Sequence, residues 1–247
     1  MRIYNRLSIL ALAMHFSTAT PIGAGRDITT DSGILHGSID PSSPAVRQFL
    51  GVPFALPPTG ARRWLPPTAF NNSSISINTT AFGPTCPQIL LSTQLTPDVF
   101  SAKARNRTEF FPVEEFSEDC LTLNVWTPAS TDGSKLPVLV WFFGRAILQG
   151  GAHSLANYRI NIFGFPNAPG LADRNLGLLD QRAALEWVRT NISALGGDPG
   201  RIVACGKSSG AISVDFLHFL LPADPIVYES IMESGTHWFP QKSRHGT

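Results

Sequence analysis

The chain has few charged residues, and their signs nearly cancel. Only 15% of its 247 residues are Asp, Glu, Lys or Arg, and the formal net charge is +1. Proteins that bind nucleic acid or an anionic membrane surface usually carry a basic excess, which this composition does not have. We therefore expect neither kind of partner, while an apolar content of 43% predicts a globular domain.

Long apolar runs are also missing from the sequence. A membrane-spanning helix needs about 20 consecutive apolar residues, and residues 7–16 form only a short apolar run. Two arginines precede that run and small residues follow it, which is typical of a signal peptide cleaved after Ala19. We expect residues 1–19 to be a signal peptide and residues 20–247 to be secreted without a membrane span. A buried N-terminal helix is the alternative.

Cysteine is scarce, with three residues in the chain. Cys86 and Cys120 lie in polar, loop-like surroundings, and Cys205 lies in an apolar run. In the oxidising environment that a secreted chain meets, a bridge between the first two would close a loop worth about 3–4 kcal/mol. We interpret Cys205 as a buried core thiol and not as a nucleophile.

Acceptor sequences for N-glycosylation are more numerous. Four of the five lie in a polar stretch where we expect surface loops, and two of them overlap. The candidate glycosylation sites are Asn71, Asn72, Asn78, Asn106 and Asn191.

The hydrophobic pattern predicts a β region followed by alternating strands and helices. A hairpin is expected over 28–37 and a strand over 47–52, and residues 68–116 are rich in loops. The rest of the pattern predicts strands at 121–126 and 136–143, a helix at 178–195, a strand at 201–205, a helix at 211–221 and a strand at 229–235. Asn175 is the predicted N-cap of the helix at 178–195, and Gly196 with Gly197 is its predicted stop. This order is typical of an α/β fold with a mainly parallel sheet. The uninterrupted apolar run at 136–143 predicts a strand covered on both faces.

Residues 206–210 read G-x-S-x-G, between the predicted strand at 201–205 and the following helix. This is the context of a nucleophile elbow, in which a serine stands on a sharp turn with its Oγ pointing out of the sheet. The two glycines would let strand and helix pass closely. Ser208 is thus the candidate nucleophile, and the backbone N–H of Ser209 would face the reacting oxygen. An ordinary glycine-rich turn is the alternative.

Longer segments between residues 28 and 236 carry a more specific signal than the elbow. They are Gly-Val-Pro-Phe-Ala at 51–55 with Arg63 and Trp64, Ser-Glu-Asp-Cys-Leu-Thr-Leu-Asn-Val at 117–125, Asn-Tyr-Arg at 157–159 with Phe-Gly-Phe at 163–165, Asn-Leu-Gly-Leu-Leu-Asp-Gln at 175–181, and Gly-Gly-Asp-Pro at 196–199. Together with the elbow, they resemble the type-B carboxylesterases, a family of secreted α/β-hydrolases that includes cholinesterases and fungal lipases.

This resemblance implies an α/β-hydrolase fold with a bridge between Cys86 and Cys120. It also implies that small carboxylic esters are hydrolysed through an acyl-enzyme on Ser208. The implied oxyanion site consists of the backbone N–H groups of Arg145, Ala146 and Ser209. The sequence has no metal-ligand cluster and no nucleotide-binding loop, so we expect no metal and no cofactor.

Two departures from the family pattern concern the sheet and its turns. Where relatives carry a Gly-Gly-Gly turn, this chain reads Gly-Arg-Ala at 144–146, and losing one oxyanion donor costs about 10²–10³ in rate. A helix and most of an inner strand are also missing between Gly151 and Tyr158. Only about ten residues separate the strand that ends near Phe143 from a remnant at 155–160, whereas a parallel connection needs a dozen or more. Either the remnant is not a parallel strand, or the sheet is split or rebuilt. We therefore expect a truncated α/β-hydrolase fold that lacks one inner strand.

A third departure is the absence of an evident catalytic acid and base. After the elbow the chain has the acids Asp215, Asp224, Glu229 and Glu233 and the histidines His218, His237 and His245. In this fold the acid and the histidine each follow their own later strand, and none of these residues has that position. Because a serine without a base is a weak nucleophile, we expect residues 20–247 to be a partial domain with weak or no esterase activity.

Other functions stay open. The missing base, Arg145 and the glycosylation sequences favour a non-catalytic, cholinesterase-like binding protein or an inactive fragment. An acyl-transfer role is a weaker alternative, because nothing in the residues selects it over ester hydrolysis.

Overall fold

The computed structural model describes residues 27–88, 115–129, 133–144, 150, 156–220 and 222–236. The expected signal peptide, Arg145, Ala146, Asn106, His237 and His245 lie outside these residues. The described strands form three three-stranded sheets. No helix among the described residues is both long and apolar enough to cross a membrane.

The first two sheets come mainly from the N-terminal β region. Strands β1 (Asp27–Thr30) and β2 (Gly33–His36) form the predicted antiparallel hairpin, and β5 (Ser76–Asn78) pairs with β2 in parallel. In the second sheet, β4 (Val46–Pro53) pairs antiparallel with both β3 (Ser38–Ile39) and β6 (Thr122–Pro128). The predicted strands at 47–52 and 121–126 are thereby confirmed.

The third sheet is entirely parallel. Its order is β7 (Leu136–Phe142), β8 (Gly197–Lys207) and β9 (Glu229–Glu233). Helix α3 (Leu176–Asn191) lies between β7 and β8 in the chain, and α4 (Ser209–Leu220) joins β8 to β9. This alternation confirms the predicted α/β fold, because parallel neighbours need crossover connections that helices supply.

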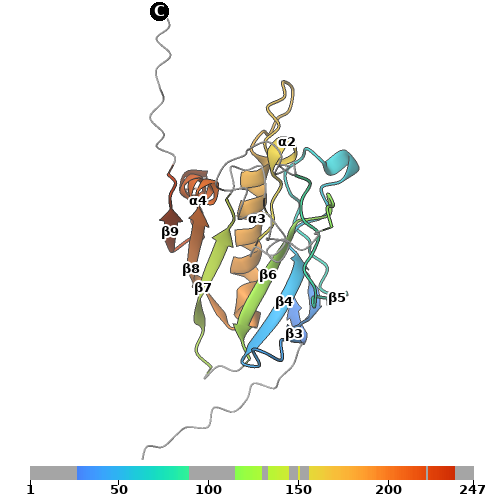
Figure 1. The fold of residues 1–247 in the computed structure, drawn as a ribbon, viewed down its shortest axis with the longest axis vertical. Coiled ribbons are helices and arrows are strands. Elements are labelled where there is room, and N and C mark those ends of the chain that lie inside the picture. Colours follow the sequence, from blue (N-terminus) through green and yellow to red (C-terminus); the bar gives the residue numbers. More distant parts are fainter. Residues whose placement is uncertain are drawn as a thin grey trace, which may run out of the picture.

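The sheet is split between β6 and β7, which is one of the outcomes that the short connection leaves open. These strands belong to different sheets, and Ala156 is the one described residue that bridges both of them. It pairs antiparallel with Leu123 of β6 and parallel with Phe142 of β7. Among the described residues, the remnant of the inner strand is therefore reduced to one residue that bridges both neighbours, with no strand at this position. Figure 1 shows β7–β9 on one side and β6, β4 and β3 on the other.

Helix α3 holds the two sides of the split together. Figure 1 shows it lying across the space between β7 and β6. Its buried residues Ala184, Leu185 and Val188 belong to the same hydrophobic cluster as side chains from both sheets. The short 3-10 helix η2 (Ile192–Leu195) continues α3, and Gly196 ends it with φ of 88°, which confirms the predicted stop. Asn175 occupies the predicted N-cap position, although its side chain makes no capping hydrogen bond.

A buried ion pair fixes the remnant to α3. Arg159 donates from its backbone N, Nε and Nη2 to the carboxylate of Asp180, at 2.7–3.0 Å. Its Nη1 donates to the carbonyls of Arg63 and Leu65. Because both side chains are almost fully buried, the charges depend on one another for solvation. The residues that follow Ala156 therefore have a defined position without a strand.

The structure contains the disulfide that the resemblance implies. Cys86 and Cys120 are bonded, with their Cα atoms 5.1 Å apart. Cys205 is free and buried, as predicted, and burial raises the pKa of its thiol. It is therefore poorly suited to act as a nucleophile.

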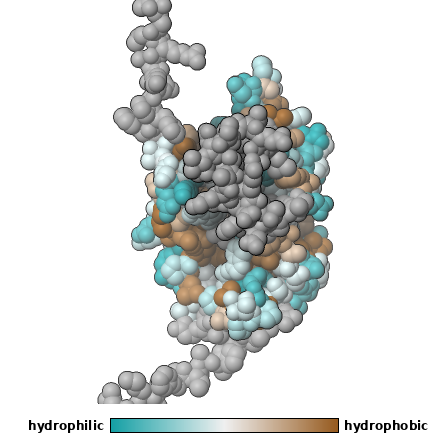
Figure 2. Space-filling model, viewed as in Figure 1, coloured by the Kyte–Doolittle hydropathy of each residue, from teal (hydrophilic) through white to brown (hydrophobic). Residues whose placement is uncertain are grey.

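One prediction for the sheet is wrong. Strand β7 is not covered on both faces along its whole length, because the side chain of Leu139 is 56% exposed, although Phe143 just after the strand is buried. The apolar run at 136–143 suits a doubly covered strand, but helices α3 and α4 pack on only one face. Figure 2 shows that hydrophobic residues reach the surface in several places on the side that it displays.

The glycosylation sequences divide into exposed and buried ones. Asn71, Asn72 and Asn78 are exposed, as expected. Asn191 is only 5% exposed, and its Nδ2, the atom that would carry a glycan, donates to the carbonyl of Trp187. Its Oδ1 accepts the backbone N–H of Asp31. The expectation of a glycan at Asn191 therefore conflicts with the folded structure.

Candidate active site

Ser208 stands on a sharp turn between a strand and a helix. β8 ends at Lys207 and α4 begins at Ser209, so Ser208 alone makes the turn. Its φ of 55° lies in the left-handed region that non-glycine residues rarely adopt. The residue is exposed. A strained, exposed serine between a strand and a helix has the geometry of a nucleophile elbow.

The two elbow glycines allow the close approach that this turn requires. A Cβ on Gly206 would lie 2.4 Å from the backbone of Gly210, so the strand and the helix nearly touch. A Cβ on Gly210 would lie 2.3 Å from the carbonyl oxygen of Phe142 in β7. Since real Cβ atoms do not approach this closely, both positions require glycine. The glycine spacing of the motif thus has a steric cause.

The ends of the neighbouring strands surround the elbow. The N–H of Ser208 donates to the carbonyl of Glu233, the last residue of β9, at 2.8 Å. On the other side, Gly144 follows β7 and packs so closely that a Cβ there would lie 2.2 Å from the carbonyl oxygen of Lys207. Ser208 therefore lies at the carboxyl edge of the parallel sheet. This is the edge where α/β proteins place their binding sites.

Of the three expected oxyanion donors, Ser209 lies within the described residues. It is the first residue of the twelve-residue helix α4, so its backbone N–H lies at the positive end of the helix dipole. Arg145 and Ala146, the other expected donors, lie outside the described residues. Gly144, which precedes them, packs against the elbow.

Buried polar contacts support the elbow from behind. The Oγ of Ser213 donates to the carbonyl of Ser209 at 2.9 Å, and Gln181 of α3 donates to that Oγ. The hydroxyl of Tyr158 donates to the carbonyl of Phe143 at 2.6 Å, and the two rings stack. Burial raises the pKa of Tyr158, so this phenol stays protonated and remains a donor.

The sequence pattern assigns no role to these supporting residues. Tyr158 and Gln181 fall within segments that resemble the family. That resemblance is the sequence signal that could have pointed to them. Ser213 carries no sequence signal apart from its position four residues after Ser209, where a helix brings the two together.

His218, Asp215 and Asp224 are not placed as a base for Ser208. His218 lies ten residues further on, about 15 Å along α4 by helix geometry, and its Nε2 is hydrogen-bonded to Ser230 of β9. Asp215 also lies on α4, seven residues from Ser208. Asp224 is paired with Arg182 and Arg189 at the surface. Within the described ranges, no group of His, Cys, Asp and Glu is arranged to hold a metal ion.

The chain is similar in sequence to known carboxylesterases. The model of the "Carboxylesterase family" matches residues 24–245. The chain is 37% identical to chlorogenic acid esterase from Aspergillus niger, over 92% of this chain and 47% of that protein. It is 40% identical to carboxylesterase 1D from Mus musculus, over 77% of this chain and 36% of that protein.

Solved structures show the same likeness. A thermophilic PNB esterase superposes with a TM-score of 0.71 at 33% sequence identity, covering 86% of this chain and 44% of that one. Another PNB esterase structure superposes with a TM-score of 0.72. The chain thus spans less than half the length of these relatives.

Proposed function

The chain belongs to the carboxylesterase family, and we propose that Ser208 is its nucleophile toward the carbonyl of a small carboxylic ester. The observation that carries this proposal is the backbone of Ser208, which has a φ of 55° between β8 and α4. Such a conformation costs about 1–3 kcal/mol and persists where the surroundings impose it. At an elbow it holds the hydroxyl out of the sheet, toward a substrate.

The mechanism requires donors and a base around that hydroxyl. As Oγ attacks the ester carbonyl, the carbonyl oxygen gains negative charge, which the N–H groups of Ser209, Arg145 and Ala146 would stabilise. The hydroxyl proton must pass to a base, and the described acids and His218 do not provide one. We therefore propose that the 247 residues by themselves hydrolyse esters weakly or not at all, although the family reaction is ester hydrolysis.

We also propose that the protein is secreted. The disulfide between Cys86 and Cys120 suits an oxidising compartment, and Asn71, Asn72 and Asn78 are accessible for glycosylation. The expected signal peptide at 1–19 supports the same route.

Two measurements on the purified chain test the proposed nucleophile and its activation. Hydrolysis of p-nitrophenyl acetate should stay within a few-fold of the Ser208→Ala background, while a fluorophosphonate probe should label Ser208 slowly or not at all. Ser43→Ala, which changes an exposed serine in a turn, serves as the matched control. Hydrolysis far above background that Ser208→Ala abolishes would overturn the proposed inactivity and support the proposed nucleophile.

A non-catalytic binding protein is the second candidate. The hydrogen bond between His218 and Ser230 favours it, because it commits the histidine of α4 to a structural contact. Rapid fluorophosphonate labelling of Ser208 would contradict this function, since an inert serine reacts slowly.

A further inference from the structure

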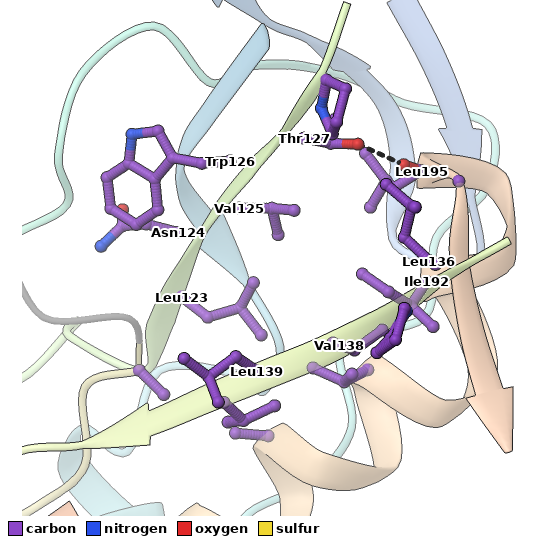
Figure 3. A pocket seen from close by; sticks show the side chains of 18 residues that line it. Leu123, Asn124, Val125, Trp126, Thr127, Leu136, Val138, Leu139, Ile192 and Leu195 are labelled. Atoms are coloured by element: carbon purple, nitrogen blue, oxygen red, sulfur yellow. Dashed lines mark hydrogen bonds between the residues drawn. The ribbon is translucent and has the colours of Figure 1, made fainter. Parts of the chain in front are cut away.

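An apolar slot separates β6 from β7. Its volume is about 270 Å³. Strand β6 forms one wall and β7 forms the other, while α3 and η2 contribute Ala184, Val188, Ile192 and Leu195. Figure 3 shows Leu123 and Val125 projecting into the slot from one strand, with Val138 and Leu139 on the other strand.

The walls of the slot are strand edges. β6 pairs with β4 on its far side, and β7 pairs with β8 on its far side. On the sides that face each other, Ala156 makes the one strand bridge that the described residues provide to each strand. An edge of this kind presents backbone N–H and C=O groups that another strand can pair with.

Ala156 defines the width and the direction of the slot. Because it bridges Leu123 and Phe142 at the same time, the two walls at this end have room for one strand between them. The bridge is antiparallel to β6 and parallel to β7. From this end, β6 continues to Pro128 and β7 runs back to Leu136. The slot therefore has room for about six extended residues, roughly 20 Å, with their direction already set.

The lining of the slot selects the chemistry of an occupant. None of its eighteen lining residues carries a charge. Polar contacts in the slot would therefore come mainly from the backbone edges. A charged side chain in the slot would lose hydration without gaining a partner. An uncharged extended peptide would instead bury its side chains and use its backbone groups for pairing.

The chain's own connection is too short to fill the slot. Gly150 is fixed by hydrogen bonds between its backbone and Gln88. It packs against the ring of Phe143, which directly follows β7. Both Gly150 and Ala156 therefore lie at the carboxyl end of β7. With five residues between them, the connection reaches at most about 10 Å into the slot and back.

We propose that the slot between β6 and β7 binds an extended, uncharged peptide strand of about six residues from another polypeptide. The peptide runs antiparallel to β6 and parallel to β7. Backbone hydrogen bonds to both edges supply affinity, and burial of its side chains against α3 and the walls supplies specificity for apolar residues. This site is separate from Ser208 and does not depend on the proposed esterase chemistry.

A fluorescein-labelled peptide of six alternating valines and threonines, with a lysine at each end, is a direct probe. Fluorescence anisotropy with the folded chain should show saturable binding. A peptide with alternate backbone amides N-methylated should bind at least tenfold more weakly, because it loses pairing donors. Leu139→Lys, at a half-exposed position in the slot, should weaken binding at least tenfold. Ile231→Lys, at a similarly exposed position on β9, should leave it within twofold.

Hydrogen exchange provides a readout that needs no variant. Peptide binding should slow amide exchange in β6 and β7 and leave β9 unchanged. Absence of saturable binding, equal binding of the N-methylated peptide, or equal weakening by Ile231→Lys would overturn the proposal. So would a dimer in sedimentation that the peptide dissociates, because the occupant would then be a second copy of the chain.

Discussion

At the scale of single residues, Ser208 combines backbone strain with two compensating contacts. Its left-handed φ is held by the hydrogen bond from its N–H to Glu233 and by the bond from Ile212 to its carbonyl. A glycine would adopt the same conformation without a Cβ clash. Serine is therefore less favourable for stability here than glycine would be. Such local strain is common at functional positions.

Replacing Ser208 by glycine should consequently stabilise the protein. We expect Ser208→Gly to raise the free energy of unfolding by about 0.5–1 kcal/mol relative to Ser208→Ala, after the larger unfolded-state entropy of glycine is subtracted. Urea unfolding of the two variants measures the difference. If Ser208→Gly is the less stable of the two, the turn is not strained in solution.

Gly210 should be intolerant of any side chain. In Gly210→Ala, the new Cβ would lie 2.3 Å from the carbonyl oxygen of Phe142, so the strand and the helix must separate. We expect a loss of about 1–3 kcal/mol in unfolding free energy. Gly200→Ala is the matched control, because a Cβ there meets only the side chain of Asp198, at 3.3 Å. Equal melting temperatures for the two variants would contradict the packing at the elbow.

We expect exposure of the asparagine side chain, and not the acceptor sequence alone, to decide which sites carry a glycan. When the chain is produced in a eukaryotic secretory host, we expect glycans at Asn78 and at one of the overlapping sites Asn71 and Asn72, and none at Asn191. Mass spectrometry of tryptic peptides, before and after enzymatic removal of glycans, assigns each site. A glycan at Asn191 would show that this side chain is modified before it becomes buried.

At the scale of elements, the residues after Ala156 are held by an ion pair instead of a strand ladder. Arg159 and Asp180 join this segment to α3, and the guanidinium also reaches the carbonyls of Arg63 and Leu65. A strand would satisfy its backbone through its neighbours. Here a single buried side chain connects the loop at 63–65, the remnant and the helix.

Removal of the Asp180 charge should therefore be costly. Asp180→Asn leaves the guanidinium of Arg159 buried without a counter-charge, and we expect a loss of about 3–5 kcal/mol in the free energy of unfolding. Asp198→Asn, which disrupts an exposed pair with Arg201, should cause no measurable change by the same urea titration. A small effect of Asp180→Asn would mean that water reaches this ion pair.

At the scale of the whole molecule, one face of the parallel sheet is only partly covered by the described residues, with Cys205 buried on it and larger apolar side chains exposed. The registers of β7, β8 and β9 place Leu139 and Ile231 on the same face, and both side chains are at least half exposed. Helices α3 and α4 pack on the other face, where Val140 and Ala204 are buried. The described residues leave part of this apolar face without a cover.

Such a face should bind an apolar dye. We expect the folded chain to enhance the fluorescence of anilinonaphthalene sulfonate, and Leu139→Ser with Ile231→Ser to reduce that enhancement at least twofold. Stability should change by less than about 0.5 kcal/mol, because both positions are exposed. Ile162→Ser, an exposed residue of α2 (Asn161–Gly164), is the control. An unchanged dye signal in the double variant would place the dye elsewhere.

The sequence determined most elements and the elbow. Two short runs around a turn predicted β1 and β2, alternation predicted β6, and helical spacing with a glycine stop predicted α3, because these signals are local. The G-x-S-x-G spacing predicted the elbow, since no other residue fits where β8 and α4 nearly touch. The split was one of the outcomes that chain length left open, because about ten residues cannot form a parallel crossover.

Only the tertiary structure decided which side chains are buried and which residues distant in sequence contact one another. Asn191 heads an acceptor sequence, yet the distant Asp31 and the packing of α3 bury it. Leu139 lies in an apolar run, yet no described element covers it. Tyr158 supports the elbow by a hydrogen bond to Phe143, 15 residues earlier in the chain. Ser213 does so by a hydrogen bond to Ser209, one helical turn earlier. Local patterns report the conformation of a segment, whereas burial and long-range contacts depend on what the rest of the chain places beside it.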